Sequence, residues 1–265
     1  MKKLRVFSVI LLLISTGAFV AFRTYSKHIQ DNTPPVVTCD SEELTVSVTA
    51  TKEDLLTGVA AKDSRSGDVT DSVVVESMSA FTEEGTRIIT YAAVDDSMNV
   101  GRCERTLVYE DYAPPVFHMN KPLCFTVGQS IDILSCISAQ SVLDGDLTSN
   151  IKYSLEKTIN TMTAGEYPIE FRVMDSGGNT VYLKTQISIS DKNYAGIEVK
   201  LKDYLIYLSV GEGFDPALYY QEADREGELS IESNVNTSQA GTYYVDYVVE
   251  GTMSSGKSRL VVVVR

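Results

Sequence analysis

The stretch Gly165-Glu-Tyr-Pro-Ile-Glu-Phe-Arg-Val-Met-Asp-Ser-Gly-Gly-Asn179 decides the fold, because its apolar and polar residues alternate. A period of two is typical of a β-strand with one buried face. The same pattern begins at Gly85 and again at Gly241, at spacings of 80 and 76 residues. Counted from each glycine, the fourth, sixth and eighth residues are apolar: Ile89, Tyr91 and Ala93; Ile169, Phe171 and Val173; Val245, Tyr247 and Val249. This recurrence predicts three copies of one β unit.

Proline pairs mark where the copies begin. Pro34-Pro35 precedes the first repeat and Pro114-Pro115 the second, and proline suits such places because it cannot donate to an inner strand. A related segment, Asn193 to Gly196, precedes the third repeat but has glycine in place of proline. About seven short strands per repeat, separated by turn residues, predict a β-sandwich for each copy.

The N-terminus carries a separate signal. Residues 6–22 form a run of seventeen residues without a charge, preceded by Lys2, Lys3 and Arg5 and closed by Arg23. The run is slightly short for a bilayer core and long for the apolar region of a cleaved signal peptide. We interpret it as an uncleaved signal anchor, with cleavage as the alternative. The basic cluster predicts a cytoplasmic N-terminus and an extracellular C-terminal region.

Several motifs resemble the bacterial immunoglobulin-like surface domains of the hyalin-repeat type. They are the proline pair running to Cys39, Gly67-Asp-Val-Thr70, the strand from Gly85 to Asp95, and Asn99 to Cys103. The resemblance covers residues 33–190 well and 193–265 weakly. It implies an immunoglobulin-like sandwich and an extracellular role as a stalk, spacer, adhesive or glycan-associated module.

The predicted fold is therefore all-β: three tandem immunoglobulin-like β-sandwiches preceded by one N-terminal transmembrane helix. Residues 1–32 are assigned to a cytoplasmic tip, signal anchor and stalk. The immunoglobulin-like domains are predicted at 33–110, 111–191 and 192–265, the last being divergent. We expect a bacterial single-pass membrane protein.

The four cysteines of an exported chain are readily interpreted as two disulfides, although four allow three pairings. Cys39 and Cys103 lie near the two ends of the first repeat, where the hyalin-repeat pattern also has cysteines. Cys124 and Cys136 bracket one turn and would form a local clip. The alternative is four reduced, buried thiols. Without a Cys-x-x-Cys motif or a nearby histidine, a zinc site is not predicted.

Aspartates gather in the turns of the first two repeats. Asp95 in the first repeat, and Asp144, Asp146 and Asp175 in the second, are candidate calcium ligands, with Asp63, Asp68 and Asp96 nearby in sequence. The alternative is that each bonds to its own backbone as an Asx turn. Calcium needs six to eight oxygens, more than one turn supplies.

Charge and composition limit the partners. The net charge is −13, and residues beyond 30 carry 18 basic and 36 acidic side chains, or −18. Such a body disfavours nucleic acid, so the expected partners are the membrane through the N-terminal helix and an unknown surface protein or glycan. No catalytic motif is recognised and no cofactor besides calcium is considered. The candidate binding surface is Tyr219, Tyr220, Tyr243 and Tyr244, with strand-filling aromatics as the alternative.

We therefore predict a membrane-anchored extracellular repeat protein that acts as a spacer or adhesion module and is not an enzyme. One alternative is a glycan-binding or exopolysaccharide- or cell-wall-associated protein. Another is a wall-active hydrolase, which would need a pair of acids in a cleft.

Overall fold

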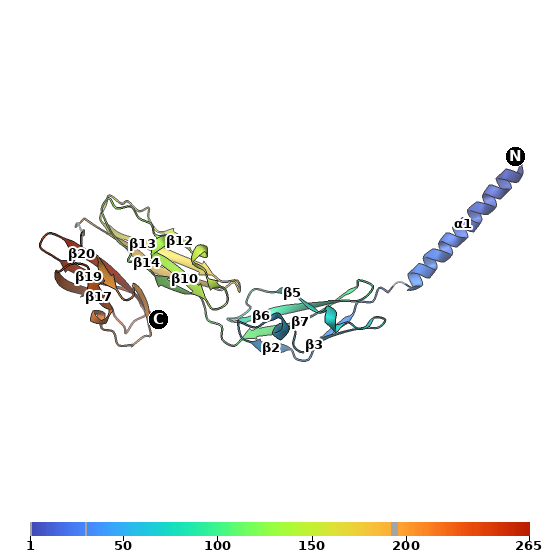
Figure 1. Ribbon diagram of the computed structural model, residues 1–265, viewed down its shortest axis with the longest axis horizontal. Coiled ribbons are helices and arrows are strands. Elements are labelled where there is room, and N and C mark those ends of the chain that lie inside the picture. The colour runs from blue at the N-terminus through green and yellow to red at the C-terminus, as the bar shows by residue number, and fades with distance from the viewer. Residues whose placement is uncertain (1, 30, 192–195) are drawn as a thin grey trace. The chain divides into compact units, whose positions relative to one another are not determined.

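The computed structural model describes residues 2–29, 31–191 and 196–265, with the side chains of residues 7, 8 and 10–25 in the first helix. The chain falls into two compact units, Met1–Glu110 and Asp111–Arg265. Unit one holds repeat one, and unit two holds repeats two and three (Figure 1). Unit one ends at Glu110, just before the second proline pair. The boundary predicted between residues 191 and 192 adjoins residues 192–195, which lie outside the described residues.

Helix α1 spans Lys2–Ile29. Our prediction of a transmembrane helix is wrong: among the described residues, no helix has both the length and the apolarity that crossing a membrane requires. The uncharged run is seventeen residues and contains Ser8, Ser15 and Thr16, whereas about 20 mainly apolar residues are needed.

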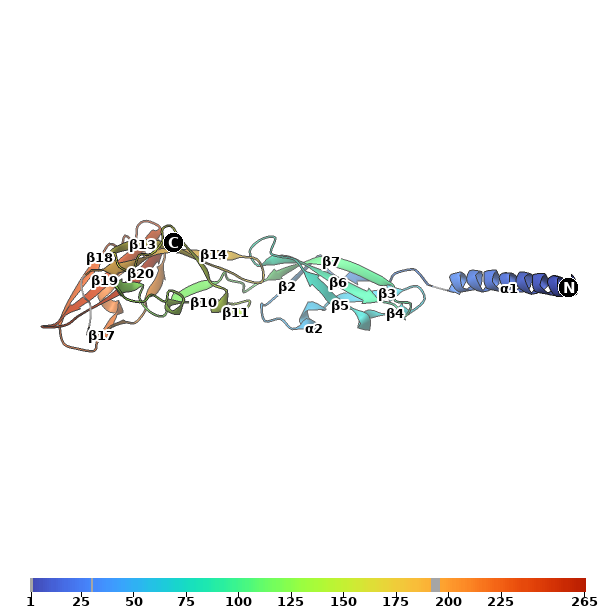
Figure 2. The same cartoon turned by 90° about the horizontal axis from the view of Figure 1, so that it is seen from above.

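Repeat one is a two-sheet sandwich whose described residues form seven strands, the number that the sequence predicts. One sheet has the order β1-β3-β4 and the other β2-β7-β6-β5, shown from above in Figure 2. The strands are β1 Val36–Cys39, β2 Glu43–Val46, β3 Val59–Asp63, β4 Gly67–Asp68, β5 Val74–Met78, β6 Thr86–Val94 and β7 Val100–Tyr109.

Repeat two repeats this topology with sheets β11-β10-β8 and β12-β13-β14-β9. Its strands are β8 Val116–Met119, β9 Cys124–Thr126, β10 Ile137–Ser141, β11 Gly145–Asp146, β12 Lys152–Leu155, β13 Gly165–Met174 and β14 Thr180–Ser190. In both repeats a short early strand pairs in parallel with the last strand, β2 with β7 and β9 with β14.

Repeat three keeps the four-stranded sheet, β16-β20-β19-β18, but the described residues give its other sheet only β15-β17. The strands are β15 Val199–Leu201, β16 Leu205–Leu208, β17 Tyr220–Ala223, β18 Glu228–Ser233, β19 Gly241–Glu250 and β20 Ser255–Val264. This smaller sheet is the structural counterpart of the sequence divergence in the third copy.

The recurring alternating stretch forms β6, β13 and β19, and its apolar side points into each core as predicted. Tyr91, Phe171 and Tyr247, the middle residues of the three triplets, are each 0% exposed. The buried side chains form three clusters, each centred on one repeat. A buried aromatic residue at the centre of each copy therefore anchors the two sheets to each other.

The sequence missed one short helix, α2 Lys52–Leu55 in repeat one. Thr51 caps its start, and the Asp54 carboxylate accepts from the Thr51 backbone amide in return, which is a capping box. The buried Arg105 side chain donates to the carbonyl of Leu55, the last helical residue, and to the carbonyl of Thr57 just after the helix. It also donates to the hydroxyl of Tyr91, so the helix is tied directly to the central core residue.

Candidate functional site

Repeats two and three are joined by a buried arginine. Arg259 on β20 is 5% exposed and donates twice to the Asp246 carboxylate, at 2.6 and 2.9 Å. It reaches into repeat two to donate to Glu166 on β13 at 3.0 and 3.3 Å. Lys257 adds a second ion pair to Asp246 at 2.8 Å. Burial by itself would raise the pKa of Asp246, but the bonds from Arg259 and Lys257 outweigh it and hold the pKa below its ordinary value.

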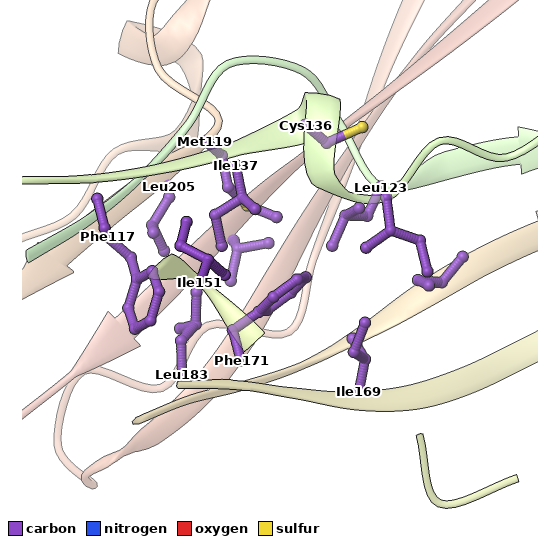
Figure 3. Packing of buried hydrophobic residues seen from close by; sticks show 14 of the residues in the cluster. Phe117, Met119, Leu123, Cys136, Ile137, Ile151, Ile169, Phe171, Leu183 and Leu205 are labelled. Atoms are coloured by element: carbon purple, nitrogen blue, oxygen red, sulfur yellow. The ribbon is translucent and has the colours of Figure 1, made fainter. Parts of the chain in front are cut away.

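The two repeats also share apolar packing, because β20 buries side chains on both faces. Leu260, Val262 and Val264 belong to the core of repeat three, whereas Val261 lies in the core of repeat two. Leu205 of repeat three lies among the side chains of repeat two, as Figure 3 shows. Repeats two and three therefore form one compact unit and not two separate domains.

A groove of about 880 Å³ opens between these two repeats. Its lining is mainly polar and carries four basic side chains, Lys121, Lys200, Arg225 and Lys257. The acidic side chains on its wall are Asp132, Glu198 and Asp224. Hydroxyl and amide groups complete the lining, and this composition suits a polar ligand better than an apolar one.

Cys124 and Cys136 both line this groove. Burial raises the pKa of the Cys124 thiol to about 12, and burial also raises the pKa of Cys136. Both groups are therefore protonated at neutral pH, which makes them poor nucleophiles. Their pairing as a local clip stays a prediction.

The four predicted tyrosines do not form one exposed cluster, because each is half-buried against a core. Tyr219, Tyr220 and Tyr243 pack on the core of repeat three, while Tyr244 packs on the core of repeat two beneath Arg259. Neighbouring residues on a strand face opposite ways, and here both faces are covered. The strand-filling interpretation describes these positions better, and a binding role for them stays untested.

In repeat one the Cys39 and Cys103 sulfur atoms lie 2.9 Å apart. Cys39 ends β1 in one sheet and Cys103 lies on β7 in the other, so a bond between them would link the two sheets. Burial, followed by the contact with Cys39, raises the pKa of Cys103 to about 12. The geometry is compatible with the predicted first disulfide, which needs only a small approach of the two atoms.

Three buried carboxylates meet at one end of repeat one. Asp31 lies just before β1, Asp63 ends β3 and Asp95 follows β6, and one oxygen atom of each lies within 4.8 Å of the others. Their exposed fractions are 7%, 7% and 4%. The sequence predicted Asp95 as a calcium ligand, noted Asp63 nearby, and placed Asp31 in the stalk. The structure instead makes Asp31 part of repeat one, because the Asn99 side chain donates to its carbonyl at 3.2 Å.

The other predicted calcium ligands bond within repeat two. Asp146 is exposed and accepts from Thr148, whose hydroxyl and amide lower the pKa of Asp146. Asp144 accepts from the Ser176 amide at 2.8 Å. Asp175 is buried and accepts from the Tyr112 hydroxyl at 2.6 Å. Only the Asp146 contact is an Asx turn, because the contacts of Asp144 and Asp175 join residues far apart in the sequence. Calcium binding by these three residues stays a prediction.

Residues 30–109 match the HYR domain family. The 81.3 kDa protein of Acholeplasma phage L2, described as uncharacterized, is 27% identical over 171 residues, which is 63% of this chain. The chain spans 23% of the length of that relative.

Solved structures align with most of this chain at low TM-scores of 0.23 to 0.24. The extracellular domain of protocadherin GammaB4 is 12% identical, with 88% of this chain and 49% of that chain covered at a TM-score of 0.24. Drosophila N-cadherin EC1-4 is 14% identical, and the alignment covers 89% of this chain and 76% of that chain at a TM-score of 0.24. The CBM51-2 and INT domains of Clostridium perfringens ZmpB, solved with GlcNAc, are 13% identical. That alignment covers 87% of this chain and 42% of that chain at a TM-score of 0.23.

Proposed function

We propose, from the premise that residues 30–109 are a HYR domain in a chain of immunoglobulin-like repeats, that this protein is a non-catalytic spacer and binding module acting outside the cell. The resemblance to surface domains supports the location. A Cys39–Cys103 disulfide, if formed from the two sulfur atoms 2.9 Å apart, would support it further, since disulfides persist in oxidising compartments. The cores are filled by side chains of the repeats themselves, which leaves binding to the surfaces and to the groove.

The observation that carries the proposal is the buried, ion-paired junction inside unit two. Arg259 contacts acids of both repeats, and the two repeats share buried side chains. A junction held in this way presents the surfaces of two repeats in a fixed arrangement, which suits recognition or load bearing.

Protease digestion of intact cells tests the proposed location. The segment near Glu110 and Asp111 joins the two units, so an added protease is expected to cut there and release unit two. Detection of the chain with antibodies against each unit would report the cut. A chain that stays whole on intact cells, but is cut after the cells are broken, would refute an extracellular location.

Glycan binding is a second candidate function, and the polar groove favours it. Sugars and acidic polymers are recognised by hydroxyl, amide and basic side chains like those of the lining. A glycan array probed with the whole chain would test this. The Lys121→Glu variant is expected to lose binding, whereas Lys62→Glu on repeat one should keep it. Equal binding by both variants, or loss only when Tyr219 and Tyr220 are replaced by alanine, would move the contact away from the groove.

A further inference from the structure

The three buried carboxylates of repeat one are incompletely satisfied by the protein. Asp31 uses its Oδ1 atom to accept from the Thr33 amide at 3.0 Å. Asp63 uses its Oδ1 atom for the amides of Arg65 and Ser66, both at 2.7 Å. The Oδ2 atoms of Asp31 and Asp63 are fully buried and accept no hydrogen bond from the described residues. Buried carboxylate oxygens without a partner are rare, because their desolvation is uncompensated.

Neighbouring cations provide little compensation. The Arg65 Nε atom is 3.9 Å from Asp31 Oδ2, beyond hydrogen-bond distance, and the Arg65 side chain is 53% exposed. Asp95 accepts from the Asn99 amide and side chain at 2.8 and 2.7 Å. These contacts position the Asp95 carboxylate but add no charge. Among the described residues, the negative charge of three acids within 4.8 Å of one another is therefore offset by one arginine contact at 3.9 Å.

Repeat two is an internal comparison, because it has the same turns without this group of acids. Ser141 ends β10 at the position where Asp63 ends β3 in repeat one. The Tyr112 hydroxyl donates to Asp175 Oδ2 at 2.6 Å and accepts from the Asn179 side chain at 2.9 Å. Asp175, the counterpart of Asp95, thus gains a hydroxyl donor from the protein in repeat two, whereas Asp95, within the described part of the chain, accepts from Asn99 alone.

The serine also shows what the turn itself requires. Ser141 Oγ accepts from the amides of Leu143 and Asp144 at 3.1 and 3.2 Å, the same two positions that donate to Asp63. One oxygen atom is therefore enough to cap this turn. The second oxygen of Asp63 accepts no hydrogen bond in the turn and is buried, and the Asp63 carboxylate lies beside two other carboxylates.

We propose that Asp31, Asp63 and Asp95 bind one calcium ion in repeat one. The donor set is entirely oxygen, which suits a hard cation, and calcium accepts mono- or bidentate carboxylates in flexible geometry. Zinc would favour nitrogen or sulfur ligands. Because Asp31 precedes the first strand, the bound ion fastens the start of the repeat to the turns after β3 and β6. This site goes beyond the proposed function and is independent of any surface ligand.

Calorimetric titration with calcium chloride tests the site on the whole chain, after treatment with EDTA and its removal. The unmodified protein is expected to bind one calcium ion tightly and to melt at a higher temperature with calcium. Asp63→Ser copies the serine of repeat two and is expected to abolish the tight binding and the melting shift. Asp71→Asn removes an exposed carboxylate of the same repeat and should leave both unchanged.

A fold control separates metal binding from turn stability. In EDTA, Asp63→Ser is expected to melt at or above the temperature of the unmodified protein, because it keeps the turn cap and removes a repelling charge. Melting clearly below the unmodified protein in EDTA would show that protein contacts alone stabilise the three acids, and it would overturn the proposal. Absence of calcium heat with the unmodified chain, or equal binding by Asp63→Ser, would overturn it as well.

Discussion

Replacing Arg259 with methionine should loosen the junction between repeats two and three. Methionine fills similar space but leaves Asp246, whose side chain is 17% exposed, with Lys257 as its remaining ion-pair partner. Breaking a buried ion pair by removing one partner costs about 3 to 5 kcal/mol of unfolding free energy. Because Lys257 still neutralises part of the charge, we expect the lower end, about 3 kcal/mol.

Urea unfolding measures this loss. With a slope of about 2 kcal/mol per molar urea, the midpoint of unit two should fall by roughly 1.5 M. Hydrogen exchange in β13, β14 and β20, followed by mass spectrometry, reports unit two separately from β6 and β7 of unit one. The matched control is Arg102→Met, which removes an equally well-aligned pair with Glu76 from an exposed surface of repeat one. Solvent screens the Arg102–Glu76 pair, so its loss should leave the unfolding midpoint of unit one nearly unchanged.

An Arg259→Met midpoint within about 0.3 M of the unmodified protein would refute the argument, because the buried pair would then stabilise no more than an exposed one. A double-mutant cycle with Glu166→Gln extends the test across the two repeats. If Arg259 couples the repeats, the two losses should be less than additive.

Three further predictions follow from contacts in the three repeats. Gly256→Ala should lower the unfolding free energy by about 1 to 3 kcal/mol, because the new Cβ would collide with the backbone carbonyl of Ile197. The control is Gly213→Ala, whose new Cβ meets no atom within 4 Å, and equal melting temperatures for the two variants would contradict the prediction. The lowered pKa of Asp246 means that its stabilisation is complete above about pH 4 and is lost as pH falls through the folded value, so acid should destabilise the unmodified protein more steeply than Asp246→Asn. A Cys39–Cys103 bond should stabilise repeat one by about 4 kcal/mol on the chain-entropy model, and a melting temperature that does not respond to reduction would exclude it.

Alternation along single strands was predictable because it follows from the covalent geometry of the chain. Successive side chains of an extended backbone point to opposite faces, so Ile169, Phe171 and Val173 must share a side whatever their neighbours are. The same holds for Tyr91 and Tyr247 in the other copies. The proline pairs likewise lie directly before β1 and β8, because their lack of a backbone donor is a local property.

Some missed features had local signals in the sequence. Thr51-Lys-Glu-Asp54 is a capping box, which announces the short helix α2. The apolar run from Leu260 to Val264 is typical of a strand buried on both faces, and β20 does pack on two repeats. Asp31 precedes Pro34 by the same three residues that separate Asp111 from Pro114, a spacing that assigns it to the repeat. The apolar run at the N-terminus misled in the opposite direction, because its length fell short of a crossing helix.

The sequence by itself determined the strands, their inward faces and the threefold copying, since each depends on residues a few positions apart. Only the tertiary structure decided which distant groups meet. Arg259 donates to Glu166, which lies 93 residues earlier in the sequence, and carboxylate oxygens of Asp31 and Asp95 lie within 4.8 Å of each other. These contacts depend on how the sheets stack and how two repeats pack together, which the alternation of apolar and polar residues along one strand does not determine.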